Sequence, residues 1–314
     1  MKKLVLIAAA VAAIASCAKV ETINTSTPQQ IAFEGYNFGM TKAQTLTGSL
    51  GVYASKNADG AEYFGNTEFK SKSLEDGSTV FVGDKYWPRE ESLDFTLYAP
   101  YSETIVTPGR NEITTKGLDA ETDFLYGATV LSNKTSANGT MDITLKHAKC
   151  MVEVKVASPS NGLFKINSVN FGTQSTKGDV TITYNEGAPN FEKKSAVWSN
   201  LTTGNLTITK EDTEIPGPAT TFCTQLLIPS DVSDVTADRK IESLVISYSR
   251  RTDYGTGYET LDYTYTPEAP ITLQEGKNYV FTLTFAADEI TFNPTIEDWT
   301  VNDSSFLETV TPTK

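Results

Sequence analysis

Short segments in which apolar and polar residues alternate recur along most of the chain. In one of them, Val152, Val154 and Val156 alternate with Glu153 and Lys155. An alternation with a period of two lets a strand bury one face and expose the other, as in antiparallel sheets. Similar segments lie at residues 93–98, 142–146, 180–184, 206–208, 244–248, 261–265 and 279–285. The pattern therefore predicts an all-β fold.

Turn-forming residue pairs separate these segments, for example Asp59-Gly60 and Asn161-Gly162. Such pairs supply the backbone geometry that tight hairpins need. Many short strands with this punctuation are typical of β-sandwiches. The polar stretch 132–140 marks the expected boundary, so we expect two tandem β-sandwich domains, at residues 43–139 and 140–314.

The first seventeen residues have the pattern of an export signal. Lys2 and Lys3 precede an uncharged apolar run, which ends at Ile14-Ala15-Ser16-Cys17. The run is too short to cross the ~30 Å hydrocarbon core, which predicts a cleaved signal peptide at residues 1–16. Its ending resembles the lipobox of bacterial lipoprotein signal peptides, which implies acylation of Cys17, for example by palmitate, and a membrane tether. The alternative is an ordinary signal with an incidental cysteine.

The charge of the chain excludes some partners. Removing residues 1–16 takes away two lysines and moves the formal charge from −13 to −15. Nucleic-acid binding needs clustered Lys and Arg, and adhesion to anionic lipid needs positive charge, so neither is expected. Cys150 and Cys223 are the cysteines that remain after Cys17. Cys150 shares the phase of the inward valines, which favours two buried thiols over a disulfide, the open alternative.

The sequence contains no His-Glu-x-x-His, Gly-x-Ser-x-Gly, P-loop or paired Cys-x-x-Cys motif. The chain has one histidine, His147, which lies between two predicted strands and is expected to be a hydrogen-bonded structural residue. The Arg250-Arg251 pair is interpreted as an exposed hairpin feature. Scattered carboxylates leave a glycosidase pair open. We expect no enzyme activity, no cofactor and no metal site.

Residues 17–42 form a separate region upstream of the first domain. Residues 18–30 are polar and are interpreted as a tether. Next, Ile31 and Phe33 share one phase, and Tyr36, Phe38 and Met40 share another, which predicts a strand with a bulge or bend at Gly35. We expect this strand to fill a groove in the first domain and to be displaceable by a strand from another molecule, because open sheet edges recruit compatible strands.

Five further segments stand out by their order and spacing, and together they span nearly the whole mature chain. These segments are Tyr86-Trp87-Pro88 with residues 93–101, then residues 123–128, 143–154, 222–229 and 271–299. They resemble motifs of the fimbrillin family, the subunits of type V pili.

The resemblance implies two transthyretin-like domains, passage to the outer membrane as a lipoprotein, and assembly into surface fibres that support adhesion. In the family, a surface protease removes the lipidated segment by cutting after a basic residue, often arginine. The matching place here is Lys42–Ala43, and no arginine precedes Arg89. Lys42 is therefore the expected processing site, and an uncleaved anchor or tip subunit is the alternative.

Assembly also needs a donor strand. Residues 300–314 are the expected donor tail, through Val301, Phe306, Leu307 and Val310. A head-to-tail contact of this kind does not close on itself and yields an open filament, so the expected partners are other pilus subunits, including copies of this chain.

Two rival functions remain from the sequence alone. One is a tethered glycan-binding lipoprotein that uses exposed aromatic residues, with Trp87, Trp198 and Trp299 as candidates, although the apolar neighbours of Trp87 and Trp299 favour burial. The other is a surface hydrolase with clustered carboxylates.

Overall fold

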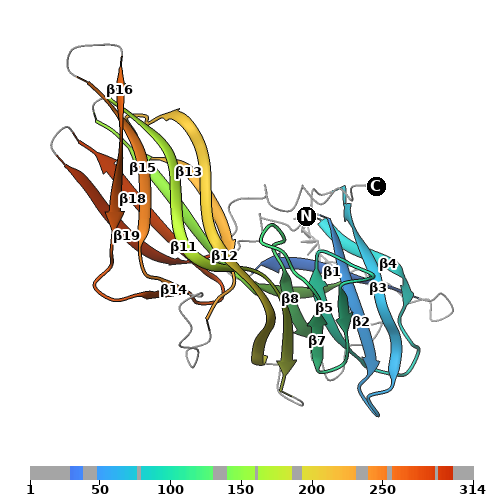
Figure 1. Ribbon diagram of the computed structural model, residues 1–314. Coiled ribbons are helices and arrows are strands. Elements are labelled where there is room, and N and C mark those ends of the chain that lie inside the picture. The colour runs from blue at the N-terminus through green and yellow to red at the C-terminus, as the bar shows by residue number, and fades with distance from the viewer. Residues whose placement is uncertain are drawn as a thin grey trace, which may run out of the picture.

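The computed structural model describes residues 29–37, 48–75, 79–129, 140–159, 162–185, 193–230, 240–252, 257–286 and 289–299. Every regular element within these ranges is a β-strand, which confirms the all-β prediction. The described part accordingly contains no helix that could cross a membrane. Figure 1 shows two β units, one at each end of an elongated molecule.

The first unit is a closed β-barrel of seven strands. Its hydrogen-bonded order is β1-β4-β3-β2-β5-β8-β9, and the pairing of β1 with β9 closes the ring. The core inside it contains Ile31, Phe33, Phe69 and Phe95, all fully buried. Two open sheets were expected here, and the sheet instead closes on itself. The strands are β1 (Gln30–Asn37), β2 (Ser49–Lys56), β3 (Glu62–Ser73), β4 (Thr79–Tyr86), β5 (Leu93–Ala99), β8 (Leu125–Thr129) and β9 (Met141–His147).

The second unit is a sandwich of two sheets. One sheet has the order β13-β10-β18-β19, and the other contains β16-β15-β11, with β12 beside β11. Val152, Val154 and Val156 of β10 point into the core between the sheets, as the alternation predicts. These strands are β10 (Cys150–Ala157), β11 (Phe164–Tyr184), β12 (Lys193–Glu214), β13 (Thr220–Leu227), β15 (Leu244–Arg251), β16 (Tyr258–Tyr265), β18 (Lys277–Phe285) and β19 (Ile290–Asp298), and β14 (Lys240–Ile241) pairs with β17 (Ile271–Thr272).

The two cysteines of this sandwich are free thiols, as predicted. Cys150 and Cys223 are both buried and unbonded. Burial raises the pKa of each thiol to about 12. They are therefore packed as small apolar groups and are not reactive at neutral pH.

The two units share a sheet and a core. The first half of β11 pairs with β15, and its end pairs with β7 (Glu112–Thr115), which in turn pairs with β6 (Val106–Pro108). In Figure 1, β11 and β12 run from the sandwich toward the barrel. The core at this junction combines barrel residues with residues of β11 and β12. It includes Tyr98, Val106, Ile113, Leu118, Phe124, Tyr126, Val180, Ile182, Tyr184 and Trp198.

The burial of β5 (Leu93–Ala99) corrects one expectation. All seven residues of β5 are buried, although the alternation predicts that one face of this strand is exposed to solvent. The face that carries Asp94, Thr96 and Tyr98 is covered because the chain after β5 folds back over it, and Thr96 donates a hydrogen bond to the backbone oxygen of Arg110. β9 follows the expected boundary between residues 139 and 140 and pairs with β1 and β8 of the barrel.

Candidate strand-exchange site

The candidate functional site is the groove that β1 fills in the barrel. The first residues of β1 pair antiparallel with β4, with Phe33 opposite Phe81. Residues Phe33 to Asn37 pair parallel with β9, from Met141 to Leu145. β1 therefore closes the gap between two strands that would otherwise be sheet edges.

Two side chains of β1 occupy the barrel core. Ile31 and Phe33 are both 0% exposed. The Phe33 ring packs edge-on against Phe69 and Phe95, with centroid distances of 5.4 and 5.2 Å. Without β1, these rings would line an apolar trench that is open to water, which is unfavourable.

The remaining residues of the predicted exchange apparatus are only partly described. Tyr36 lies within β1. The positions of Cys17, Phe38, Met40, Lys42 and Ala43 fall outside the described residues, as do those of Val301, Phe306, Leu307 and Val310.

Of the bulge or bend predicted at Gly35, the bulge is not found there. The parallel ladder with β9 runs without a shift from Phe33 to Asn37. The irregularity lies against β4, between Gln30 and Ala32. Sequence alone could not locate it, because the extra residues belong to β4.

A buried polar cluster lies where β9 ends, at the junction of the two units. His147 is 2% exposed, and its Nδ1 lies 2.9 Å from Oδ1 of Asp123. The ring of Trp299 stacks on the His147 ring at a centroid distance of 3.6 Å. His147 is thus a hydrogen-bonded structural residue, as expected, and Trp299 packs also on Met151 and Leu226.

Lys149, a fully buried lysine, is a second member of this junction. Its Nζ donates hydrogen bonds to the backbone oxygens of Asp119 and Thr122. Burial lowers the pKa of Lys149 to about 8, although the nearby carboxylates of Asp119 and Asp123 oppose the shift. Sequence analysis missed this residue, because a lysine beside a turn normally faces solvent.

The pKa of Lys149 gives a first prediction. Between pH 8 and 10 the unfolded chain keeps the Lys149 proton and the folded chain loses it, so this residue makes stability rise with pH. The unfolding free energy of the wild type minus that of Lys149→Met should therefore increase by a few kcal/mol at most over this range. Cys223 and the tyrosines are unchanged between the two proteins, and Cys150 stays protonated in this range in both folded proteins because burial raises its pKa to about 12, so these contributions cancel. Urea unfolding at a series of pH values measures this difference, and a difference independent of pH would contradict the prediction.

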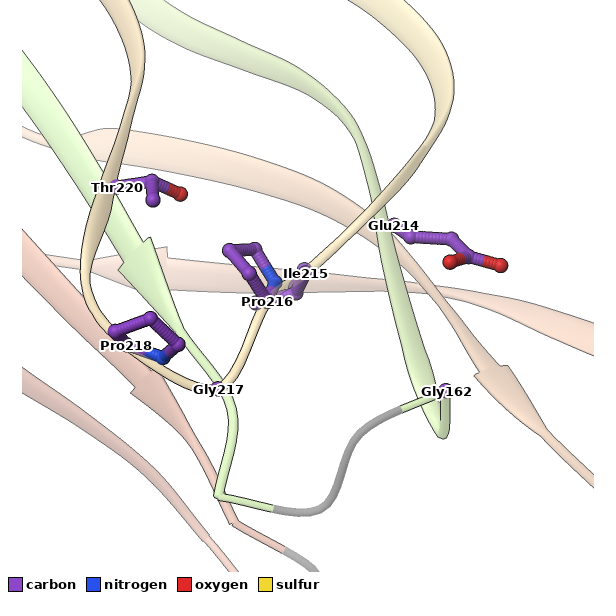
Figure 2. Close-up of a pocket in the computed structure, with 7 residues that line it drawn as sticks. All are labelled: Gly162, Glu214, Ile215, Pro216, Gly217, Pro218 and Thr220. Atoms are coloured by element: carbon purple, nitrogen blue, oxygen red, sulfur yellow. The ribbon is translucent and has the colours of Figure 1, made fainter.

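One open hollow lies at the far end of the sandwich. It measures about 630 Å³ and is lined by Gly162, Glu214, Ile215, Pro216, Gly217, Pro218 and Thr220. In Figure 2 the carboxylate of Glu214 points away from the two proline rings. Glu214 is the only ionisable residue of this lining, so the hollow does not supply the two carboxylates that glycoside hydrolysis requires.

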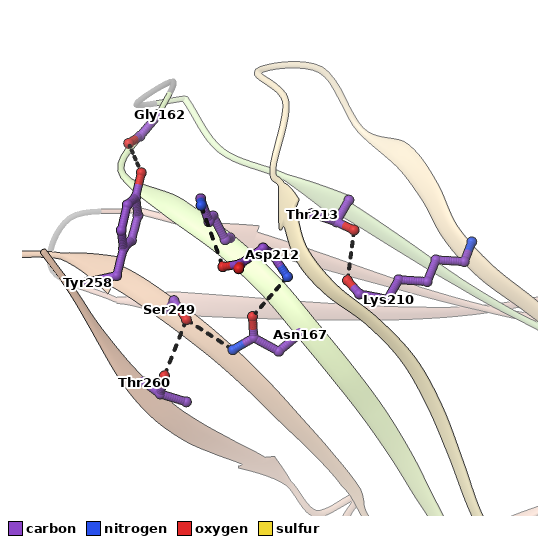
Figure 3. Close-up of polar contacts among 9 residues, drawn as sticks. Gly162, Asn167, Lys210, Asp212, Thr213, Ser249, Tyr258 and Thr260 are labelled. Atoms are coloured by element: carbon purple, nitrogen blue, oxygen red, sulfur yellow. Dashed lines mark hydrogen bonds and ion pairs between the residues drawn. The ribbon is translucent and has the colours of Figure 1, made fainter. Parts of the chain in front are cut away.

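A polar network lies next to this hollow on β11, β15 and β16. Asn167 donates to Ser249 at 3.0 Å, and Ser249 lies 3.4 Å from Thr260 (Figure 3). Tyr258 donates to the backbone oxygen of Gly162. These groups satisfy one another, which is typical of a sheet surface. No group of three or more metal-ligating side chains occurs in the described ranges.

The tryptophans do not form a glycan platform. Trp87, Trp198 and Trp299 are 5, 9 and 5% exposed. Burial was predicted for Trp87 and Trp299. The rival interpretation of these three residues as an exposed binding face is therefore wrong. Arg250 and Arg251 are exposed at a hairpin end, as expected.

Solved structures share this two-unit all-β fold. A putative cell adhesion protein from Bacteroides uniformis is 15% identical, with a TM-score of 0.54, and the match covers 86% of this chain and 98% of that one. A fimbrial protein from Bacteroides vulgatus is 17% identical, with a TM-score of 0.54 and coverage of 87% and 100%. No curated protein sequence matches the chain.

The chain thus has the same fold as these bacterial cell adhesion and fimbrial proteins. The fimbrillin-like family matches residues 41–299. The chain belongs to the fimbrillin-like family. The matched range begins after β1 and ends at Trp299, so it leaves out both segments that the sequence predicts to take part in strand exchange.

Proposed function

We propose that the chain is a structural, non-enzymatic subunit of a cell-surface fimbria, a type V pilus that supports adhesion. Family membership supports the pilus role. The signal pattern that ends at Cys17 supports export through the periplasm to the outer membrane as a lipoprotein.

Assembly in this proposal proceeds by strand exchange at the β1 groove. The main support for strand exchange is the position of β1. This strand supplies two fully buried side chains and closes the barrel, and it precedes the residues that match the family. Backbone pairing to β4 and β9 would give affinity, and the buried side chains would give selectivity. Another subunit's strand takes the place of β1, and the tail at residues 300–314 is the donor to a further subunit.

Processing at Lys42–Ala43 would release β1, because β1 ends at Asn37 and the cut follows it in sequence. The mature N-terminus of material extracted from the cell surface tests this step. Ala43 as the first residue identifies a polymerising subunit. An acylated Cys17 identifies an anchor or tip subunit that keeps β1.

Locking β1 in place should stop assembly. Glu34 of β1 lies opposite Asp142 of β9 in the ladder, so the double variant Glu34→Cys/Asp142→Cys places two cysteines within disulfide reach. We expect this variant to remain monomeric on non-reducing gels of surface extracts, and reduction to restore the high-mass ladder.

A matched control joins two strands that both stay in the barrel. Ser49 of β2 lies opposite Lys70 of β3. The variant Ser49→Cys/Lys70→Cys should assemble normally with its disulfide intact. Normal assembly of the β1-locked variant under oxidising conditions would refute strand exchange at this groove.

A further inference from the structure

We propose that the groove selects a strand with an aliphatic residue two positions from an aromatic one, and that this strand comes from a different subunit, not from a second copy of this chain. The inference rests on the proposed strand exchange and names the partner of that same groove.

The first step is the shape of the groove. Ile31 and Phe33 fill two fully enclosed positions, and both belong to the barrel core. The second position is walled by the rings of Phe69 and Phe95, which meet Phe33 edge-on. An aromatic ring therefore fits there, and a small or charged side chain leaves a void or a buried charge.

The second step is that the spacing is fixed. Gln30 and Ala32 are two positions apart in β1, whereas their partners in β4, Tyr86 and Val82, are four positions apart. The extra residues therefore lie in β4, and β1 itself is regular. From Phe33 onward the ladder with β9 is also regular. A replacement strand that makes the same hydrogen bonds must therefore place its two inward side chains two residues apart.

The third step is the sequence of this chain's own tail. Its large apolar residues after Trp299 are Val301, Phe306, Leu307 and Val310, and no two of them are two positions apart. This holds in either chain direction. Trp299 and Val301 have the required spacing, but Trp299 is buried against His147.

Each remaining alignment of the tail therefore puts Ser, Thr, Asp, Glu or Pro into one enclosed position. With Phe306 in the Phe33 position, for example, Ser304 takes the Ile31 position. Emptying an aliphatic core site lowers affinity by at least about thirty-fold. A second copy of this chain is thus a poor donor.

Peptide exchange tests the inference on residues 18–314, the chain without its signal peptide and the predicted lipid-bearing Cys17. A cleavage site for a specific protease is introduced within residues 38–47, and β1 carries a fluorescent label. After cleavage, β1 is held in the groove only by non-covalent contacts. Release of β1 is followed by anisotropy as competitor peptides are added. The competitors are residues 29–40, the native tail 300–314, the tail with Ser304→Ile, and the tail with Thr311→Ile as a matched control. Ser304→Ile places an isoleucine two residues before Phe306, whereas Thr311→Ile adds the same side chain without creating such a pair.

We expect the 29–40 peptide and the Ser304→Ile tail to displace β1, and the native and Thr311→Ile tails to be at least about thirty-fold weaker than the Ser304→Ile tail. If the native tail competes as well as the Ser304→Ile tail, or if the Ser304→Ile tail fails while the 29–40 peptide exchanges, the selectivity inference is overturned and strand exchange stands. If no peptide displaces β1, the proposed function falls together with the inference.

Discussion

Phe33→Ala should lower the unfolding free energy of the chain by about 3–5 kcal/mol, the usual cost of truncating a buried phenylalanine to alanine. Phe33 is 0% exposed and contacts two rings of the barrel core. Alanine would leave a cavity between Phe69 and Phe95 that the closed barrel cannot easily collapse. Urea unfolding followed by far-UV circular dichroism measures the loss.

An exposed aromatic residue provides the control for this variant. Tyr86 is 48% exposed and lies opposite Gln30 at the start of β1. Tyr86→Ala should change the unfolding free energy by less than about 0.5 kcal/mol. Equal effects of the two substitutions would mean that the groove is not a structural part of the barrel core.

The effect at Phe33 also bears on assembly. A weakened β1 should exchange faster with peptide 29–40, because its buried side chains hold it in the groove. The packing of Phe33 would then determine both the unfolding free energy and the rate at which β1 exchanges. The disulfide lock at Glu34 and Asp142 is the complementary test, because it strengthens the attachment of β1 instead of weakening it.

The sequence predicts the strands better than their partners. Alternation identifies β10, β15 and β18 and the inward phase of Cys150, since local burial determines that pattern. It does not reveal that β1 pairs parallel with β9, because these strands are distant in sequence. Nor does it reveal the second buried face of β5, which depends on a later segment that folds over it.

The junction shows the same limit. Sequence predicts separate structural roles for His147 and Trp299, and both side chains are buried. The stacking of Trp299 on His147 joins the two units, and the contacts of His147 with Asp123 and of Lys149 with Thr122 join residues 24 and 27 positions apart. Tyr126 of β8 likewise donates a hydrogen bond to Glu275, which lies just before β18. Contacts of this kind leave no periodic signal in the chain.

The second large effect is expected at this junction. Trp299→Ala should lower the unfolding free energy by about 3–5 kcal/mol, because it removes a buried aromatic side chain. The indole stacks on His147 at 3.6 Å, and the Trp299 backbone N–H donates to the oxygen of Gly276 at 2.9 Å. Without the indole, His147 and its Asp123 partner would become open to water. Trp299→Phe retains a stacking ring and should lose clearly less.

The matched control for Trp299 is Ile296, which is 60% exposed on β19, three residues earlier in the chain. Ile296→Ala should change stability by less than about 0.5 kcal/mol. Urea unfolding by far-UV circular dichroism compares the variants without relying on tryptophan fluorescence. Trp299 directly precedes the proposed donor tail in sequence and is buried, so its side chain is not available to a partner's groove. If Trp299→Ala proved as mild as Ile296→Ala, Trp299 would not be held firmly at the junction, and the alignment that pairs Trp299 with Val301 would be available for self-donation.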